Sequence, residues 1–112
     1  MIALGCDHGG FELKQAVMKH LSVKGVEYCD CGCYSTDSVD YPDVAKEVCT
    51  KIASDEGAKG ILICGTGIGI SIAANKVKGV RCALCFNEKV AMMTVPAWEN
   101  GLMVQDNRIA AV

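Results

Sequence analysis

The sequence predicts an α/β fold in which a parallel sheet of about five strands lies between two layers of helices. Short apolar runs alternate with amphipathic segments of about ten to fifteen residues, the pattern of strands joined by helical crossovers. Glycine clusters follow two of these runs, at residues 9–10 and 65–69. The chain has 112 residues, of which 51% are hydrophobic and 21% charged, so we expect a single domain over residues 1–112.

The first predicted element is a buried strand over residues 1–6, an apolar run that ends directly before Asp7. An amphipathic helix is predicted over residues 11–24, with Gly25 as its stop signal. Apolar residues at helical spacing form its expected core face: Leu13, Ala16, Val17 and Leu21.

A second strand is predicted over residues 26–31, followed by a loop over residues 32–41. Pro42 favours a helix start, because its fixed φ and missing N–H suit the first helical turn. The expected core face of this second helix is Val44, Ala45, Val48, Cys49 and Ile52.

The third unit is predicted as a strand over residues 60–64, a glycine loop and a helix over residues 70–75. A fourth strand follows over residues 80–85, and Asn87 is a candidate N-cap of a fourth helix. Right-handed crossovers between such strands build a three-layer αβα sandwich with a Rossmann-like sheet. Its ligand binds beyond the carboxyl ends of the strands, where the strand order reverses, so residues after the first and third strands are the candidates.

Composition excludes several classes of function. Eleven basic residues against thirteen acidic ones, with one Trp, three Tyr and two Phe, disfavour a nucleic-acid binder. The uncharged run over residues 61–74 is shorter than the roughly 20 residues that span a bilayer. The start of the chain lacks the basic region of a secretory signal. We therefore expect a cytoplasmic protein with a small-molecule partner, and neither a nucleic acid nor a membrane.

The eight cysteines lie mostly within apolar runs, which favours reduced, packed thiols over a disulfide scaffold. Cys29, Cys31 and Cys33 alternate, so in a strand they would share one face and could bind a metal. A fourth ligand is missing nearby, and packing is the favoured interpretation. Cys82 and Cys85 would point to opposite faces of a strand, which disfavours a redox pair.

The segment 64–69 (CGTGIG) places a thiol at the end of a buried strand, followed by three glycines and a helix start. Glycines let backbone N–H groups approach a ligand, and a helix amino terminus stabilises an anion or a thiolate. Cys64 is therefore a candidate reactive thiolate, with a buried structural cysteine as the alternative. The segment lacks the lysine of a Walker loop, the GxGxxG of a dinucleotide fingerprint and the arginine that a cysteine phosphatase needs.

Asp7 and His8, directly after the first strand, form the second candidate group. A carboxylate beside an imidazole can orient a sugar hydroxyl and move a proton between oxygens. The alternative is a loop cap beside an exposed histidine.

Four motifs together resemble the type-B ribose-5-phosphate isomerases, a family that also contains the galactose-6-phosphate isomerase subunits. They are residues 5–10 (GCDHGG), 38–43 (SVDYPD), 63–69 (ICGTGIG) and 71–76 (SIAANK), and the match extends over roughly residues 1–85. The resemblance implies an aldose–ketose isomerase that acts on a phosphorylated sugar through a cis-enediol, without metal or organic cofactor.

Residue by residue, the resemblance implies that Cys64 is the base that removes a proton from the carbon beside the carbonyl. Thr66 would hold the developing enediolate oxygen, together with the loop amides of Gly65, Gly67, Ile68 and Gly69. Asp7 and His8 match sugar and phosphate contacts, and Tyr41 matches a residue near the sugar ring. Family members without the cysteine use a glutamate, at the position that Ile70 occupies in this chain.

The final quarter of the chain departs from the family. The positions of the family's His-Asn motif hold Ala97 and Trp98, neither of which can replace its counterpart in proton transfer. Arg108 matches a phosphate-binding arginine, but the family's terminal helices with their further arginines would lie beyond Val112.

Three hypotheses remain. The first is a pentose-phosphate isomerase whose site is shared between the subunits of a homodimer or homotetramer. The second is a galactose-6-phosphate isomerase subunit, and the third is a phosphosugar-binding homologue with impaired turnover. A phosphorelay receiver is excluded, because it needs paired acids after the first strand and an aspartate after the third.

Overall fold

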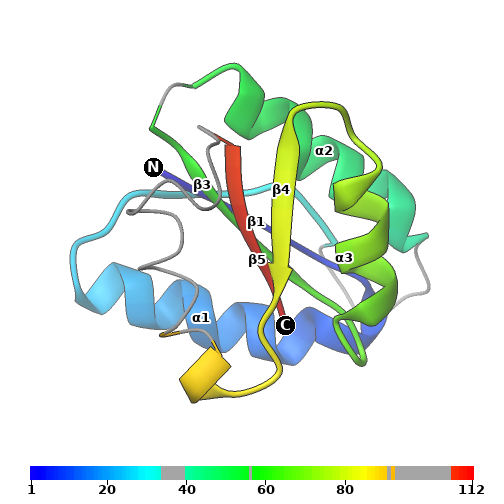
Figure 1. The fold of residues 1–112 in the computed structure, drawn as a ribbon. Coiled ribbons are helices and arrows are strands. Elements are labelled where there is room, and N and C mark those ends of the chain that lie inside the picture. Colours follow the sequence, from blue (N-terminus) through cyan, green and yellow to red (C-terminus); the bar gives the residue numbers. More distant parts are fainter. Residues whose placement is uncertain (34–39, 56, 91, 93–106) are drawn as a thin grey trace.

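The computed structural model describes residues 1–33, 40–55, 57–90, 92 and 107–112. In this part of the chain, five parallel strands form one sheet in the order β2-β1-β3-β5-β4 (Figure 1). The strands are β1 (Ile2–Cys6), β2 (Tyr28–Asp30), β3 (Lys59–Ile63), β4 (Val80–Leu84) and β5 (Asn107–Ala111). The helices are η1 (His8–Gly10, a 3-10 turn), α1 (Phe11–Val23), α2 (Tyr41–Ala53) and α3 (Ile68–Asn75).

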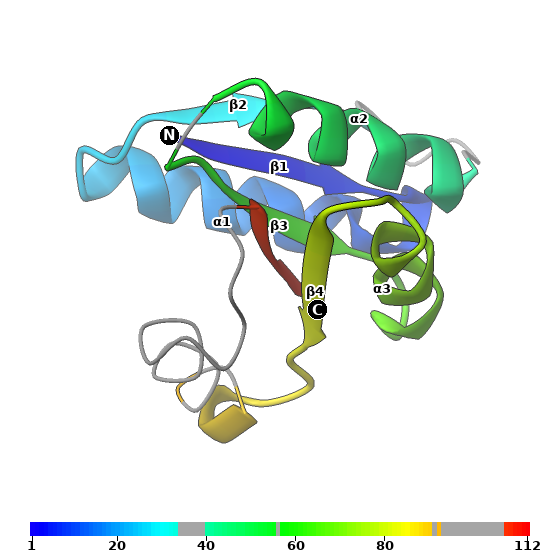
Figure 2. The same cartoon turned by 45° about the horizontal axis from the view of Figure 1, so that its top comes forward.

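Helix α1 packs on one face of the sheet, and α2 and α3 pack together on the other (Figure 2). The predicted α/β sandwich with about five parallel strands is therefore confirmed. None of the helices in the described ranges is long and apolar enough to cross a membrane.

The strand order reverses between β1 and β3. The chain leaves β1 for β2 at one edge, returns past β1 to β3, and then continues to β4 at the far edge. Cys6 pairs with Ile63 in the register of β1 and β3, so the residues that follow these two strands start side by side. The sheet thus brings the segments after Cys6 and Ile63 to the topological switch point, where ligands bind in folds of this class.

Helix α2 buries the face that its sequence predicts. It begins beside Pro42, and its buried side chains are Val44, Ala45, Val48, Cys49 and Ile52. With residues of β3, α3 and β4 they form the larger core cluster, on the α2 side of the sheet. A smaller cluster of Cys6, Cys33 and Ile63 lies on the α1 side.

The predicted core face of α1 is partly wrong. Leu21 is buried and Val17 is half-buried, but Leu13 is 46% exposed and Ala16 is exposed. Lys14 is buried instead, with 0% exposure. The helix is rotated so that positions 14, 17 and 21 face the sheet, and an ion pair between Lys14 and Asp30 accommodates the buried ammonium group.

The predicted strand over residues 26–31 is shorter in the structure, and the three alternating thiols do not share a face. Sγ of Cys31 still lies 3.9 Å from Sγ of Cys29, but Gly32 has a φ of +117°, which ends the alternation before Cys33. Cys31 packs against the larger core cluster, whereas Cys33 belongs to the smaller cluster, where its Sγ lies 3.7 Å from Sγ of Cys6. Across the ranges that the structure describes, no three Cys, His, Asp or Glu side chains are grouped to hold a metal.

All eight cysteines are free thiols. Burial raises the pKa of Cys6 and of Cys49 from 9.0 to about 11, and that of Cys31 and of Cys82 to about 12. These four thiols therefore stay protonated at neutral pH, as expected of cysteines that serve packing.

Two predicted elements shift in the third unit, and the first is β3, which is Lys59–Ile63 instead of residues 60–64. Helix α3 begins at Ile68 instead of residue 70, because the chain turns into the helix directly after Gly67. The predicted cap of a fourth helix is confirmed, since Oδ1 of Asn87 accepts a hydrogen bond of 2.9 Å from the N–H of Val90, and residues 88–90 are helical.

Candidate active site

The loop after β3 directs a backbone N–H at a thiol. Cys64 is half-buried directly beyond the strand, and its Sγ accepts a hydrogen bond of 3.0 Å from the N–H of Gly67. The start of α3, with the positive end of its helix dipole, adjoins the same sulfur. The thiol therefore lies at the ligand-binding end of the sheet, with a backbone donor aimed at it.

Gly67 makes this bond possible by its conformation and its lack of a side chain. Its φ is +77°, a left-handed conformation that residues with a Cβ rarely adopt. A Cβ at this position would lie 2.8 Å from the carbonyl carbon of Val112 and 2.9 Å from Cδ1 of Leu84. The carboxyl ends of β4 and β5 therefore pack against the loop at Gly67.

Thr66 is exposed at the tip of the loop. Its Oγ1 accepts a hydrogen bond of 3.2 Å from the N–H of Ile68. Since this bond uses the hydroxyl oxygen as acceptor, the hydroxyl hydrogen can be donated to a ligand oxygen. This is the arrangement that a group holding a developing oxyanion needs.

The loop after β1 lies against the glycine loop. Asp7 is buried, and its Oδ1 accepts a hydrogen bond of 3.1 Å from the N–H of Gly10, which caps η1, whereas His8 is exposed. A Cβ built on Gly9 would lie 3.3 Å from Oδ1 of Asp7 and 3.4 Å from the backbone N of Gly65. The structure therefore brings Asp7 and the Cys64 loop together, as the topology predicts.

Tyr41 reaches the same loop from the start of α2. A Cβ on Gly69 would lie 2.9 Å from Cζ of Tyr41, so the aromatic ring packs directly on the glycine. Tyr41 is 40% exposed and also lines a cavity of about 420 Å³ between α2 and α3, which Lys46 and Lys76 line as well. Gly69 lines this cavity as well, so Tyr41 and the end of the glycine loop share one wall of it.

Arg108 is placed apart from these residues. The register of β5 pairs its backbone with Lys59 of β3 and with Arg81 of β4, near the amino ends of the strands. The other candidates lie at the carboxyl ends. The backbone therefore does not bring Arg108 to the Cys64 loop, and Ala97 and Trp98 lie outside the described residues.

Gly10 is among the residues that the sequence places at the site, after the first strand, whereas Lys14 was missed at the level of sequence. Gly10 packs so closely on β3 that a Cβ would lie 2.6 Å from the carbonyl oxygen of Ile63, so its lack of a side chain lets the two loops meet. The pair of glycines after the first strand was the available signal. Lys14 was passed over because a lysine on a helix is ordinarily solvated.

Comparisons with known proteins show which family the chain resembles. The sequence pattern of the Ribose/Galactose Isomerase family matches residues 2–104. Ribose-5-phosphate isomerase B of Escherichia coli is 41% identical over 111 residues, which are 99% of this chain and 74% of that protein.

Solved structures are similar as well. Ribose-5-phosphate isomerase B of Clostridium thermocellum has a TM-score of 0.83 and 43% identity, and the match covers 99% of this chain and 70% of that one. The enzyme of Mycoplasma genitalium with bound ribulose 5-phosphate has a TM-score of 0.81 and 39% identity, with 98% and 69% covered. With a family pattern over nearly its whole length and relatives of this similarity, the chain belongs to the ribose/galactose isomerase family.

Proposed function

We propose that this chain interconverts ribose 5-phosphate and ribulose 5-phosphate, with Cys64 as the base. The hydrogen bond from the N–H of Gly67 to Sγ of Cys64 is the observation that carries the proposal. Relatives with this fold are named ribose-5-phosphate isomerase B, and one of them holds ribulose 5-phosphate.

In the proposed reaction, the Cys64 thiolate removes the proton from C2 of the open-chain aldose. The electron pair moves into a C1–C2 double bond, and the carbonyl oxygen at C1 becomes the enediolate oxygen. Thr66 and the loop amides stabilise the charge on this oxygen by hydrogen bonds. The thiol then returns the proton to C1, while the hydroxyl proton of O2 moves to O1, which produces the ketose. Asp7 and His8 would orient the sugar and its phosphate, with Tyr41 beside the ring.

We also propose a cytoplasmic protein that assembles as a homodimer or homotetramer. Eight free thiols suit a reducing compartment. Ile68 and Ile72 on α3 are 53% and 52% exposed beside the glycine loop, and a partner subunit would cover them. Sedimentation of a monomer at micromolar concentration would contradict the assembly.

A coupled assay of ribose 5-phosphate turnover tests the role of the thiol. Loss of a general base typically costs about 10²- to 10⁴-fold in rate, so Cys64→Ala should lose about that much. Cys29→Ala is the matched control, because Cys29 is likewise half-buried but lies on β2 at the sheet edge. Equal activity of Cys64→Ala and the control would refute Cys64 as the base.

A second candidate function is phosphosugar binding with impaired turnover, which Ala97 and Trp98 at the family's His-Asn positions favour. Weak turnover is expected on this ground, with open-chain substrates less affected than ring-closed ones. The double change Ala97→His/Trp98→Asn should then raise the rate. Measurable sugar-phosphate binding without turnover in any variant would favour the second candidate.

A further inference from the structure

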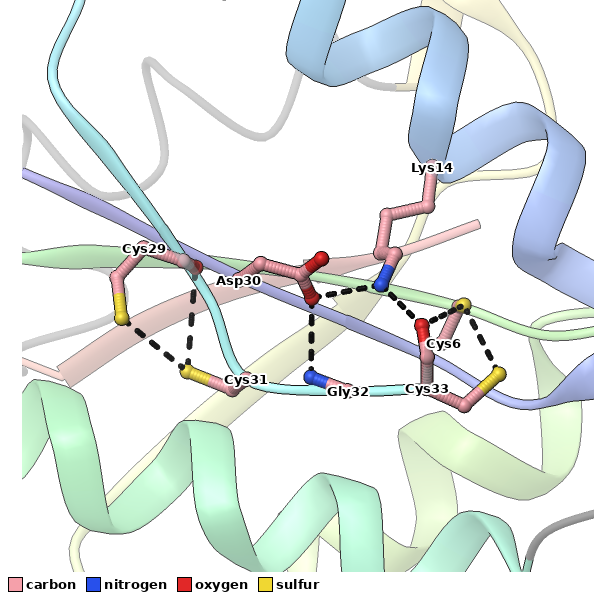
Figure 3. A network of polar contacts seen from close by, with 7 residues as sticks. All are labelled: Cys6, Lys14, Cys29, Asp30, Cys31, Gly32 and Cys33. Atoms are coloured by element: carbon pink, nitrogen blue, oxygen red, sulfur yellow. Dashed lines mark hydrogen bonds and ion pairs between the residues drawn. The ribbon is translucent and has the colours of Figure 1, made fainter. Parts of the chain in front are cut away.

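A largely buried ion pair lies between the start of α1 and the segment of residues 30–33. Nζ of Lys14, on the first turns of α1, lies 2.6 Å from Oδ1 of Asp30 and also donates a hydrogen bond to the carbonyl oxygen of Cys33 (Figure 3). The same Asp30 oxygen accepts a hydrogen bond of 3.0 Å from the N–H of Gly32. The Lys14 side chain has no exposed surface, whereas that of Asp30 is 25% exposed.

This network holds the turn of residues 32–33 against the end of β1. The N–H of Cys6 donates to the carbonyl oxygen of Gly32 at 2.7 Å, and the N–H of Cys33 donates to the carbonyl oxygen of Cys6 at 2.9 Å. Cys6 directly precedes Asp7, so these bonds fix the first end of the Asp7–Gly10 loop. As seen in Figure 3, Lys14 reaches from the helix to this turn, between Asp30 and Cys33.

The second end of the loop is the start of α1, which follows Gly10 without a break. Lys14 lies in the first turn of that helix. Its side chain therefore connects the two ends of the loop, by binding from α1 to the turn that is paired with Cys6. Hydrogen bonds to a charged donor are directional and strong, so this connection sets the position of the backbone as well as filling space.

We propose that Lys14 and Asp30 are positioning residues, which hold the Asp7–Gly10 loop against the Cys64 loop so that Asp7 and His8 meet the substrate. The inference rests on the proposed function. The alternative explanation is that the ion pair only stabilises the fold. Buried ion pairs often contribute little net stability compared with apolar residues of similar volume. The two explanations differ in what happens to substrate binding when the fold is kept.

The test uses Lys14→Met/Asp30→Asn in the full chain. Met replaces the buried lysine stem, and the Asn oxygen can still accept from the N–H of Gly32. Lys19→Met, an exposed lysine on the same helix, is the matched control. Lys14→Met alone is a second variant, which removes the ammonium group but keeps the Asp30 carboxylate at 25% exposure, so it should be less stable than the double variant.

For folded variants, we expect KM for ribose 5-phosphate to rise about tenfold with a smaller change in kcat, because a misplaced binding group weakens substrate orientation. Amide hydrogen exchange of residues 7–10 should accelerate by about the same factor, while exchange in α2 and β3 stays as in Lys19→Met. The rate of Cys64 alkylation without sugar should also stay unchanged. A KM and loop exchange equal to those of the control, in either folded variant, would overturn the inference.

The outcome is separable from that of the proposed function. If the unmodified chain turns over no ribose 5-phosphate, the proposed function fails. The hydrogen-exchange comparison still decides whether Lys14 and Asp30 hold the loop, because it needs no substrate.

Discussion

Substitution of Gly67 by alanine should strongly destabilise the chain. The left-handed conformation, with φ at +77°, costs a residue with a Cβ about 1–2 kcal/mol. The new methyl group would also lie 2.8 Å from the carbonyl carbon of Val112 and 2.9 Å from Cδ1 of Leu84. Relief of such contacts costs typically about 1–3 kcal/mol, so the free energy of unfolding should fall by about 2–5 kcal/mol.

Alanine substitutions at two other glycines separate the cost of the backbone conformation from the cost of the close contacts. Gly25 has a φ of +71° but open space around its Cα, so Gly25→Ala should cost only the backbone part, about 1–2 kcal/mol. Gly65 has neither a positive φ nor an atom within 4 Å of an added Cβ, so Gly65→Ala should change stability by about 0.5 kcal/mol at most.

Thermal unfolding measures the stability of the three glycine variants, and urea titration provides an independent check. For a domain of this size about 1 kcal/mol corresponds to about 4 °C in Tm, so Gly67→Ala should lower Tm by about 8–20 °C. The expected order of stability is Gly65→Ala, then Gly25→Ala, then Gly67→Ala. If Gly67→Ala unfolded at the same temperature as Gly25→Ala, the close approach of the loop to the ends of β4 and β5 would be refuted.

Three further predictions concern thiols and the core. At neutral pH, iodoacetamide should label Cys64 before the other cysteines, and a phosphorylated sugar should protect it; mass mapping that finds Cys85 labelled first would contradict the site. The destabilisation caused by Cys82→Ala should shrink as pH rises from about 9 toward 12. Burial raises the pKa of Cys82 from 9.0 to about 12, so the protonated thiol contributes stability that is present below pH 9 and lost above it; unfolding curves between pH 8 and 11 check this. Ile70→Glu should lower the free energy of unfolding by about 3 kcal/mol or more, since Ile70 has 0% exposure; a variant as stable as the parent in urea would show that this position is open to solvent.

Strong hydrophobic patterns were sufficient to predict most of the elements. The core face of α2 was predicted residue by residue, because five apolar positions recur at helical spacing with polar residues between them. The strand and glycine loop around Cys64 were predicted as well, since an uncharged run followed by closely spaced glycines has few other conformations. The proximity of Asp7 to this loop followed from the topology of parallel sheets.

Contacts between segments that are distant in the sequence could be identified only from the tertiary structure. Lys14 is buried and Leu13 is exposed because the side of α1 that faces the sheet depends on the ion pair with Asp30. Asp30 belongs to β2, which is distant from Lys14 in the sequence. The helical pattern holds no information about that partner. Cys33 packs with Cys6 instead of with its neighbours in sequence, since a left-handed glycine ends the alternation.

The sheet order was likewise decided by packing. The last strand, β5, inserts between β3 and β4, and its register places the backbone of Arg108 near the amino ends of the strands. Local periodicity reports only which face of an element is apolar, and it carries no information on the neighbours that pair with a strand. The residues able to do chemistry were therefore readable from their types and spacing, and the proximity of Asp7 to Cys64 from the sheet topology. The packing of Tyr41 on Gly69 and the position of Arg108 came only from long-range pairing and packing.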